Sequence, residues 1–208
     1  MRKKTDLILL QANVSKNEAR ALIGRLKTKE LIKKVAVTYS AWAPLEQDAA
    51  QAGLLHLYLK LEQPRRLSKK DIQHTERRWK KMIQSSQATE IFASRLCKVF
   101  EQSGSAAGQS PHFHYVVETT PEKGWRKEIS KWYDQEHMPG LAAVPGCIHT
   151  VRMINLDDGP RSIACYDLVD KSVMGSAEWL KVRHTAWSDR CRPHFTKTKR
   201  NMFEVLEN

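Results

Sequence analysis

The strongest constraint on the fold of this chain is an order of elements that occurs twice. In the first half, the spacing of apolar residues predicts strand, helix, strand, strand, helix and strand. Ser15 and Glu18 fit a capping box, in which each side chain accepts a hydrogen bond from the other residue's backbone N–H, so the first helix is expected to start there. The strands are predicted over residues 6–12, 35–42, 54–61 and 90–101, and the second helix over residues 69–83.

The second half repeats this order. Thr120 and Pro121 predict an N-cap followed by a proline at the first helical position. The helix expected after them places Trp132 and Glu136 on one stripe, with Tyr133 beside it. The strands are predicted over residues 112–118, 147–154, 161–169 and 196–206, and the second helix over residues 176–192.

The two halves also end alike, since residues 96–101 (LCKVFE) and residues 200–205 (RNMFEV) both contain Phe-Glu. The βαββαβ order is the ferredoxin-like motif. The sequence therefore predicts an α+β fold of two ferredoxin-like repeats, whose antiparallel sheets pack face to face as an α+β barrel within one chain or between two chains. The predicted parts are a basic N-terminal repeat (1–103), a small-residue linker (104–111) and a C-terminal repeat (112–208).

The net charge of +12 is concentrated in the first half of the chain. Residues 1–104 hold 21 Lys and Arg against 10 Asp and Glu, a net +11, whereas residues 105–208 hold 14 against 13, a net +1. Such a field attracts anions, although a solvated helix face also carries charge of this kind. The sequence lacks the basic-aromatic run with which ferredoxin-like sheets bind RNA, so nucleic acid is not the expected partner.

The sequence also narrows the compartment and the chemistry. Its apolar runs are far shorter than the roughly 20 residues of a membrane-spanning helix, so we expect a cytoplasmic protein without membrane association. Its four cysteines are scattered and are expected to be reduced. The sequence has no glycine-rich phosphate loop, no G-x-S-x-G and no H-E-x-x-H, which argues against nucleotide cofactors and serine-hydrolase chemistry.

Residues 125–154 (WRKEISKWYDQEHMPGLAAVPGCIHTVRMI) resemble the EthD-like branch of the dimeric α+β-barrel superfamily. Its members typically show W-Y-x-x-E-H-x-P at a helix end, followed by a leucine, V-P-G and a strand. The first half of the chain has no counterpart of this motif and matches in topology alone, which makes it the degenerate repeat. The matching residues are Trp132, Tyr133, Glu136, His137, Pro139, Leu141, Val144, Pro145 and Gly146.

The resemblance implies small-molecule chemistry in a barrel-shaped pocket between two sheets, in a protein that forms a homodimer. The superfamily includes cofactor-free monooxygenases, cyclases, dehydratases, isomerases, decarboxylases and haem enzymes, so the fold does not fix the reaction. We expect no cofactor, and the resemblance leaves haem open. His137 is the residue to which the motif points, as an acid/base group or as a packing residue.

Histidine at position 137 can exchange protons near neutral pH, and a position near a helix C-terminus favours its charged form. The alternative is that it bonds a carbonyl and shapes the helix exit. Tyr166 is a second candidate, because beside His137 it could donate a hydrogen bond to a phenol, enol or carbonyl oxygen. The alternative for Tyr166 is a core residue with its hydroxyl at the rim.

Three further histidines are candidates for the same pocket. His112 and His114 alternate on one strand and would share a face, so they could bind substrate, with His114 as a catalytic group. With His149 or Glu118 they could also form a metal site, but no ligand spacing supports one and no metal is predicted. A strand edge without function is the alternative.

The helix predicted over residues 176–192 places Trp179, Arg183 and Trp187 on one stripe, with Arg190 near its end. Tryptophan and arginine together could stack on an aromatic ring and bind a carboxylate. The alternative is a helix that packs its tryptophans on the sheet. The predicted substrate-binding residues are His112, Trp132, Tyr133, His149, Arg183, Trp187 and Arg190.

The leading hypothesis is a cofactor-independent enzyme acting on a small, aromatic or unsaturated, anionic metabolite. His137 would carry protons in an isomerase, dehydratase, cyclase or lyase reaction. One alternative is a cofactor-free or haem-dependent monooxygenase. The other is a non-enzymatic binding module that uses the basic N-terminal half.

Overall fold

The computed structural model describes all of the chain except residues 1–2, 29–34, 45–52, 85–87 and 207–208. The chain forms two compact units. The N-terminal unit comprises Met1–Cys97 and Phe203–Asn208, and the C-terminal unit comprises Lys98–Met202. Two strands, β4 (Thr89–Ser103) and β8 (Phe195–Val205), each run from one unit into the other. Among the described residues, no helix is both long enough and apolar enough to cross a membrane.

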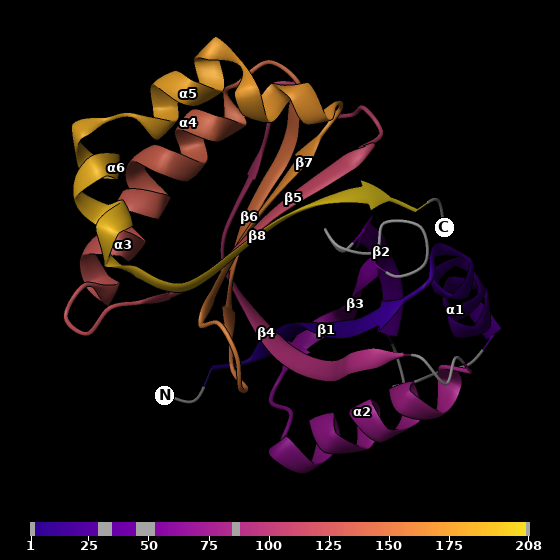
Figure 1. Cartoon of the computed structure of the whole chain (residues 1–208). Helices are drawn as coiled ribbons and strands as arrows, with labels where there is room; N and C mark the ends of the chain where they lie inside the picture. Colours follow the sequence, from indigo (N-terminus) through magenta and orange to yellow (C-terminus); the bar gives the residue numbers. More distant parts are fainter. Residues whose placement is uncertain (1–2, 29–34, 45–52, 85–87, 207–208) are drawn as a thin grey trace. The chain divides into compact units, whose positions relative to one another are not determined.

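The N-terminal unit is a sheet with two helices, in the strand order β4-β1-β3-β2-β8 (Figure 1). Antiparallel pairing aligns Leu9 with Tyr58 and with Ser94. Helices α1 and α2 pack on the sheet through a continuous apolar core. The elements are β1 (Thr5–Val14), α1 (Lys16–Thr28), β2 (Val35–Pro44), β3 (Gly53–Arg65) and α2 (Lys69–Met82).

Both helices of this unit begin at serine caps. The hydroxyl of Ser15 accepts from the backbone N–H of Glu18 at 3.2 Å, as the sequence predicts. The Glu18 carboxylate also accepts hydrogen bonds from the side chain of Arg25. The reciprocal capping box lies at α2, where Ser68 and Asp71 each accept from the other's backbone N–H. Local sequence signals therefore position both helix starts.

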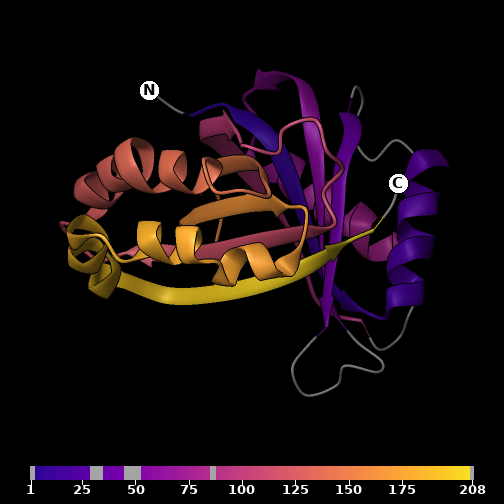
Figure 2. The same cartoon turned by 90° about the horizontal axis from the view of Figure 1, so that it is seen from above.

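The C-terminal unit repeats the arrangement, in the strand order β8-β5-β7-β6-β4. Its helices cover one face of the sheet (Figure 2), which confirms the α+β class with an antiparallel sheet. The elements are β5 (Phe113–Pro121), α3 (Arg126–Trp132), a π-helical turn (Tyr133–His137), α4 (Met138–Ala142), β6 (Cys147–Asn155), β7 (Ser162–Leu168), a 3₁₀ turn (Lys171–Gly175), α5 (Ala177–Arg183), α6 (Ala186–Cys191), a 3₁₀ turn (Arg192–His194) and β8.

The helix start predicted at Thr120 and Pro121 is wrong. Strand β5 runs through both residues, and α3 begins only at Arg126. The Thr120 carbonyl accepts from the hydroxyl of Thr196, and the Thr120 hydroxyl accepts from the backbone N–H of Arg161. These long-range hydrogen bonds keep the segment extended and outweigh the local capping signal.

The single helix predicted over residues 176–192 is also wrong, because α5 ends at Arg183 and α6 begins at Ala186. The hydroxyl of Thr185 accepts from the backbone N–H of Ser188 at 3.0 Å and caps a new helix. The same hydroxyl donates to the Glu136 carboxylate. The break ends the predicted stripe, so Trp187 no longer follows Arg183 on one helix face.

The helix that carries His137 does not end there. A π-helical turn spans Tyr133–His137, and α4 continues the helix to Ala142. In this turn the backbone N–H of Met138 donates to the carbonyl of Tyr133, five residues earlier. The widened turn directly precedes Pro139, which has no N–H to donate. His137 therefore lies inside a helix, and the expected helix C-terminus beside it is absent.

Candidate functional site

A small cavity lies in the C-terminal unit, between the helices and the sheet face that they cover. Its volume is about 40 Å³, which is room for about three water molecules at roughly 10–15 Å³ each. All of its lining residues belong to the C-terminal unit. Aromatic and arginine side chains dominate the lining, which comprises Tyr115, Val117, Trp132, Tyr133, His137, Leu141, Tyr166, Trp179, Arg183, Arg192, Phe195 and Arg200.

Strand alternation decides which residues of the sheet reach the cavity. Tyr115 of β5 and Tyr166 of β7 are register partners, and their rings stack with centroids 5.9 Å apart. Val117 follows Tyr115 on the same face, whereas His114 lies on the opposite face. The resemblance implies a pocket between two sheets, but this cavity lies beneath the helices of one unit.

His137 is half-buried and packs among aromatic rings. Its imidazole stacks on Trp132 with centroids 4.2 Å apart, and it meets the rings of Tyr133 and Tyr166 edge-on. Burial lowers the pKa of His137 from 6.5 to about 3, and the positive charges of Arg192 and Arg183 lower it further in the same direction. The expectation that a helix C-terminus favours charged His137 is therefore wrong, and the imidazole is neutral at pH 7.

Three polar atoms in the cavity wall have no hydrogen-bond partner. They are Nε1 of Trp132, Nδ1 of His137 and the hydroxyl of Tyr166. Only two more such atoms occur among the described residues, in Arg152 and Ser162. Because nearly all buried polar groups in folded proteins are hydrogen-bonded, three unsatisfied groups around one cavity indicate a place for a polar ligand or water.

Three arginines surround the same cavity. Arg183 ends α5, Arg192 begins the 3₁₀ turn before β8, and Arg200 lies on β8. Within the described part of the chain, none of the three forms an ion pair with an acidic side chain. Burial lowers the pKa of Arg192, as do the nearby charges of Arg183 and Arg200. The charge of Asp189 acts in the opposite direction, but it forms no ion pair with the three arginines in the described residues. Like charges held together without an ion-pair partner favour the binding of an anion.

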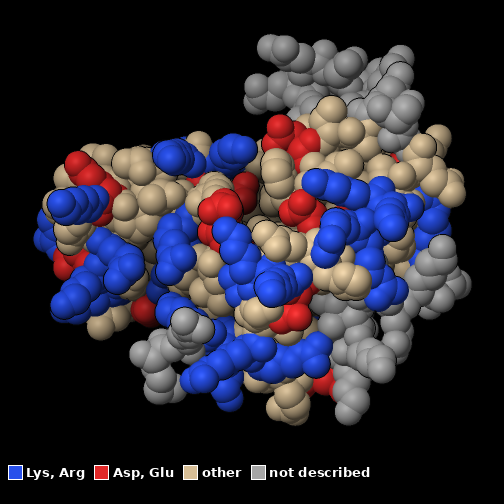
Figure 3. Space-filling view, turned by 90° about the horizontal axis from the view of Figure 1, so that it is seen from below, with Lys and Arg blue, Asp and Glu red and all other residues tan. Residues whose placement is uncertain are grey.

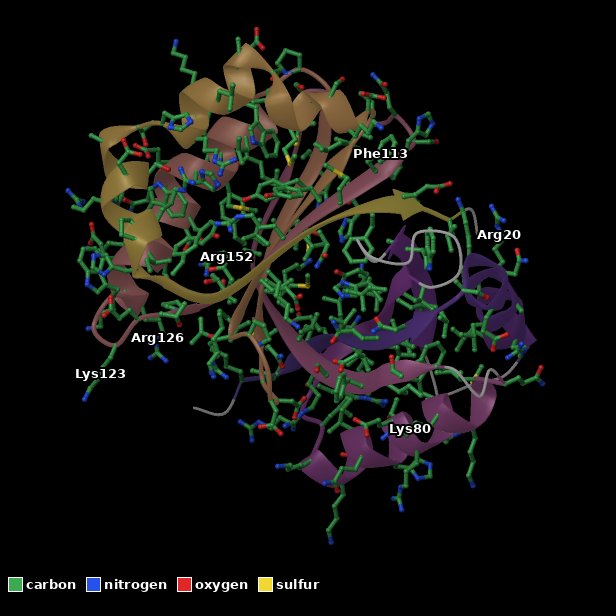
Figure 4. The ribbon with its side chains drawn as sticks, viewed as in Figure 1. Arg20, Lys80, Phe113, Lys123, Arg126 and Arg152 are labelled. Atoms are coloured by element: carbon green, nitrogen blue, oxygen red, sulfur yellow. The ribbon has the colours of Figure 1, made fainter. Side chains whose placement is uncertain are left out.

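A buried arginine supports the cavity from the strand side. Arg152 of β6 pairs with Asp134 at 2.7 Å, and its guanidinium lies 5.3 Å from the centre of the Tyr133 ring. Figure 4 shows Arg152 within the C-terminal unit, whereas Lys123 and Arg126 extend outward. The π-helical turn places Asp134 and Tyr133 next to each other, so one arginine can contact both.

The predicted site residues divide into two groups. His137, Tyr166, Trp132, Tyr133 and Arg183 all line the cavity. The remaining five do not line it, and they are His112, His114, His149, Trp187 and Arg190.

Two of the excluded histidines share a carboxylate on the opposite sheet face. His114 Nδ1 lies 2.6 Å from one oxygen of Asp167, and His149 Nδ1 lies 3.5 Å from the other. His149 also approaches Glu101 at 3.3 Å. Hydrogen bonds from both histidines hold the pKa of Asp167 at about 2, in spite of its burial. His112 precedes β5 and is exposed, so the predicted His112–His114 pair does not share a face.

The other excluded residues bind a helix carboxylate. Trp187 Nε1 donates to Glu128 of α3 at 2.9 Å, and Arg190 donates to the same oxygen at 2.7 Å. Both side chains therefore join α6 to α3. The substrate-binding role predicted for them is not supported by their position, because the helix break at Thr185 turned them away from Arg183.

Sequence reasoning missed several lining residues, chiefly Tyr115, Arg192, Phe195 and Arg200. Tyr115 could have been predicted from the alternation of side chains along β5, because it is the register partner of Tyr166 and lies on the same face of the sheet. Phe195 and Arg200 are five residues apart and would face opposite sides of a regular strand. Lys197 has a positive φ of 51°, which breaks the alternation of β8 between them.

In its observed form the cavity is too small for haem, which the resemblance leaves open. A volume of about 40 Å³ is far below the roughly 300–1,000 Å³ of pockets that enclose cofactors. Among the described residues, no group of three or more His, Cys, Asp or Glu is arranged to hold a metal ion.

Comparison with known proteins supports the fold. No family model and no curated protein matches the chain. Among solved structures, a candidate monooxygenase from Fusobacterium nucleatum aligns with a TM-score of 0.62 and 10% identity, covering 98% of this chain and 94% of that one. An anthrone oxidase-like protein aligns with a TM-score of 0.56 and 14% identity, covering 98% and 92%.

A third similar structure carries the fold name itself. It is a ferredoxin-fold protein related to antibiotic biosynthesis monooxygenases, from Listeria monocytogenes, with a TM-score of 0.52 and 9% identity, covering 99% of this chain and 97% of that one. These likenesses do not single out the EthD-like branch, which stays a prediction, as does the homodimer. At such low identity they show the fold alone, and the chain has a ferredoxin-like α+β fold.

Proposed function

We propose that the C-terminal unit is an enzyme that holds a small aromatic or unsaturated metabolite as an anion and oxidises it with molecular oxygen, without a metal or an organic cofactor. The observation that carries this proposal is the meeting of three unsatisfied polar atoms and three unpaired arginines around one aromatic cavity. Monooxygenase and oxidase descriptions among the similar structures add support.

The chemistry starts with an enolisable substrate, in which a CH₂ group lies next to an aromatic ring and a conjugated carbonyl. Loss of one proton gives a delocalised enolate, whose negative charge Arg183, Arg192 and Arg200 stabilise. The enolate carbon is then oxidised by O₂. The overall reaction is balanced as R₂CH₂ + O₂ → R₂C=O + H₂O, so the substrate supplies all the electrons and no external reductant is required.

His137 is the proposed proton acceptor. Its pKa of about 3 keeps it unprotonated at neutral pH, but also makes it a weak base while the cavity is empty. An anion formed beside His137 would raise that pKa, because the negative charge stabilises the imidazolium and offsets the arginine charges. The Tyr166 hydroxyl, which has no partner in the structure, is the proposed hydrogen-bond donor to the substrate oxygen.

Binding of such a substrate requires the cavity to widen. Phe195, Arg183 and Arg192 are half-buried, and Arg200 is exposed. Movement of these four side chains would open the cavity without disturbing the buried rings of Trp132, Tyr133 and Tyr166. The rings would then line an apolar pocket with the arginines at its mouth.

A second candidate is proton-transfer chemistry without oxygen, as in an isomerase, dehydratase, cyclase or lyase. The observation that favours it is that His137 and Tyr166 suffice for proton transfer, while the cavity lining adds no group that is needed only for oxygen. Both candidates share the enolate, and they differ in whether O₂ is consumed.

The proposal is tested by measuring oxygen uptake with two kinds of substrate. One is anthrone, a tricyclic enolisable ketone, and the other is a panel of aromatic β-keto acids. His137→Phe keeps an aromatic ring against Trp132, and Tyr166→Phe removes one hydroxyl. Ser162→Ala is the matched control, since Ser162 also carries an unpartnered buried hydroxyl but does not line the cavity.

The expected result is uptake of one O₂ per substrate by the wild type and by Ser162→Ala, with a loss of about 10²-fold or more in the two cavity variants. Turnover that continues without oxygen would support the second candidate. Uptake that is equal in all four proteins would refute the assignment of His137 and Tyr166.

A further inference from the structure

The solvent face of α2 in the N-terminal unit carries a dense positive charge. Over the 17 residues from Arg65 to Lys81, the acidic side chains are Asp71 and Glu76, against eight exposed basic ones, a net +6. Figure 3 shows Lys and Arg gathered on this face of the molecule. The exposed basic residues are Arg65, Arg66, Lys69, Lys70, Arg77, Arg78, Lys80 and Lys81.

The two acidic side chains are already engaged. Asp71 accepts from the backbone N–H of Ser68 at 2.6 Å in the capping box. Glu76 pairs with Lys80 at 2.9 Å and accepts from the backbone N–H of Ala93. Asp71 also interacts electrostatically with Arg65, so the excess positive charge lies on the other bases of this face.

Three of these bases form a line opposite the buried face of the helix. At about 100° per residue, Lys70, Arg77 and Lys81 fall within roughly 40° of one another. The buried residues Ile72 and Trp79 lie on the other side of the helix. At about 1.5 Å per residue, the three charges span roughly 16 Å along the helix axis. In the described residues, Lys70, Arg77 and Lys81 have no ion-pair partner.

The neighbouring helix differs from α2 in how its charges are exposed and paired. Helix α1 packs on the same sheet and contributes to the same core. Among its described side chains, Arg20 is the one exposed charged residue, and it is labelled in Figure 4 together with Lys80 of α2. Helix α1 also has a positive net charge in the sequence, with four basic residues against Glu18. Two of these, Lys16 and Arg25, are paired with Glu204 and Glu18.

We propose that this face of α2 binds the phosphate backbone of a duplex nucleic acid, without reading its sequence. A row of long cationic side chains on a rigid helix can follow a line of phosphates, and arginine binds phosphate with two parallel hydrogen bonds. No exposed Phe, Tyr or Trp side chain lies on this face of α2 to stack on bases. A lipid surface is a poorer partner, because the apolar residues Ile72 and Trp79 are buried in the core and cannot insert.

The experiment measures the binding of a fluorescein-labelled 20-base-pair duplex of mixed sequence, as DNA and as RNA, to the full chain at 50 to 200 mM KCl. With three phosphate contacts, the slope of log K against log salt concentration is about −2.7, which is a loss of about 40-fold over this range. The variant Lys70→Gln/Arg77→Gln/Lys81→Gln keeps good helix formers and leaves the Ser68 cap intact. This variant should lose its affinity for both duplexes, and the slope of log K against log salt concentration should become less negative by about 2.7.

The matched control is Lys123→Gln/Arg126→Gln/Lys171→Gln, which removes the same charge from exposed positions of the C-terminal unit. The control should bind both duplexes like the wild type, and equal melting temperatures should show that both variants fold. Equal weakening in the two variants would overturn the proposal, because net charge alone would then explain binding. Equal competition by polyglutamate or phosphatidylserine vesicles would also overturn it, as would no binding of either duplex at 50 mM KCl.

Discussion

Replacing Tyr166 with phenylalanine should separate stability from function at the cavity. The Tyr166 ring is 1% exposed and contacts Tyr115, His137 and Trp179, so the phenylalanine ring keeps these contacts. The hydroxyl has no hydrogen-bond partner among the residues that the structure describes. Burial raises the pKa of Tyr166 well above its usual value, so the group is a neutral hydroxyl at all ordinary pH values.

The magnitude follows from the cost of an unsatisfied polar group. A buried hydroxyl without a partner costs about 1–3 kcal/mol of folding free energy. Removing its oxygen also loses a few dispersion contacts, which offsets part of the gain. We therefore expect Tyr166→Phe to raise the free energy of unfolding by about 1 kcal/mol. For a chain of this length that corresponds to a rise of about 2–4 °C in melting temperature.

Urea denaturation measures this change, with the slope m unchanged between the two proteins. Tyr58→Phe in the N-terminal unit is the control, because the Tyr58 hydroxyl lies 3.4 Å from Nδ1 of His56. That variant should lose about 0.5–1.5 kcal/mol. A loss of 1 kcal/mol or more for Tyr166→Phe would refute the reasoning, since it would mean that the hydroxyl is satisfied in the folded protein.

Three further predictions concern the same unit. The folded pKa of His137, about 3, lies below its unfolded value of 6.5, so the associated stability is present above pH 6.5 and is lost towards pH 3. Denaturation at several pH values should show that below pH 6 the free energy of unfolding of the wild type falls by about 1.4 kcal/mol per pH unit relative to that of His137→Phe. Parallel plots of the free energy of unfolding against pH for the two proteins would contradict this. Arg192→Gln should weaken the binding of benzoate by about tenfold, as measured by calorimetry, and should leave the binding of the uncharged benzyl alcohol unchanged. Equal weakening of both ligands would contradict an anion site. Thr185→Ala should cost about 1–2 kcal/mol in thermal denaturation, whereas a continuous helix predicts a gain from the better helix former.

Most of the fold could be predicted from the sequence, because its signals are local. Alternating apolar residues predicted β3, and helical spacing with a serine cap predicted α1. The errors arose where distant hydrogen bonds outweighed local preference. Thr120 has the sequence features of a helix cap, yet its carbonyl bonds to Thr196 on another strand. The two partners are 76 residues apart, so no local pattern reports their contact.

The candidate site could be predicted only in part. The W-Y-x-x-E-H motif pointed to Trp132, Tyr133 and His137, and all three line the cavity. The face of the sheet could not be predicted, because alternation shows which residues share a face but not which face the helices cover. His114 and Tyr166 were therefore assigned to one pocket, although they lie on opposite faces.

The ferredoxin-like order of elements, the cap at Ser15 and the concentration of charge in the first half can all be predicted from the sequence, since each depends on neighbouring residues. The chemistry of the cavity depends on the folded arrangement. Burial and two arginines from distant segments make His137 neutral, and the positive φ of Lys197 brings Phe195 and Arg200 to one side of β8. These effects arise from residues that folding brings together across the chain, so they have no counterpart in any short stretch of the sequence.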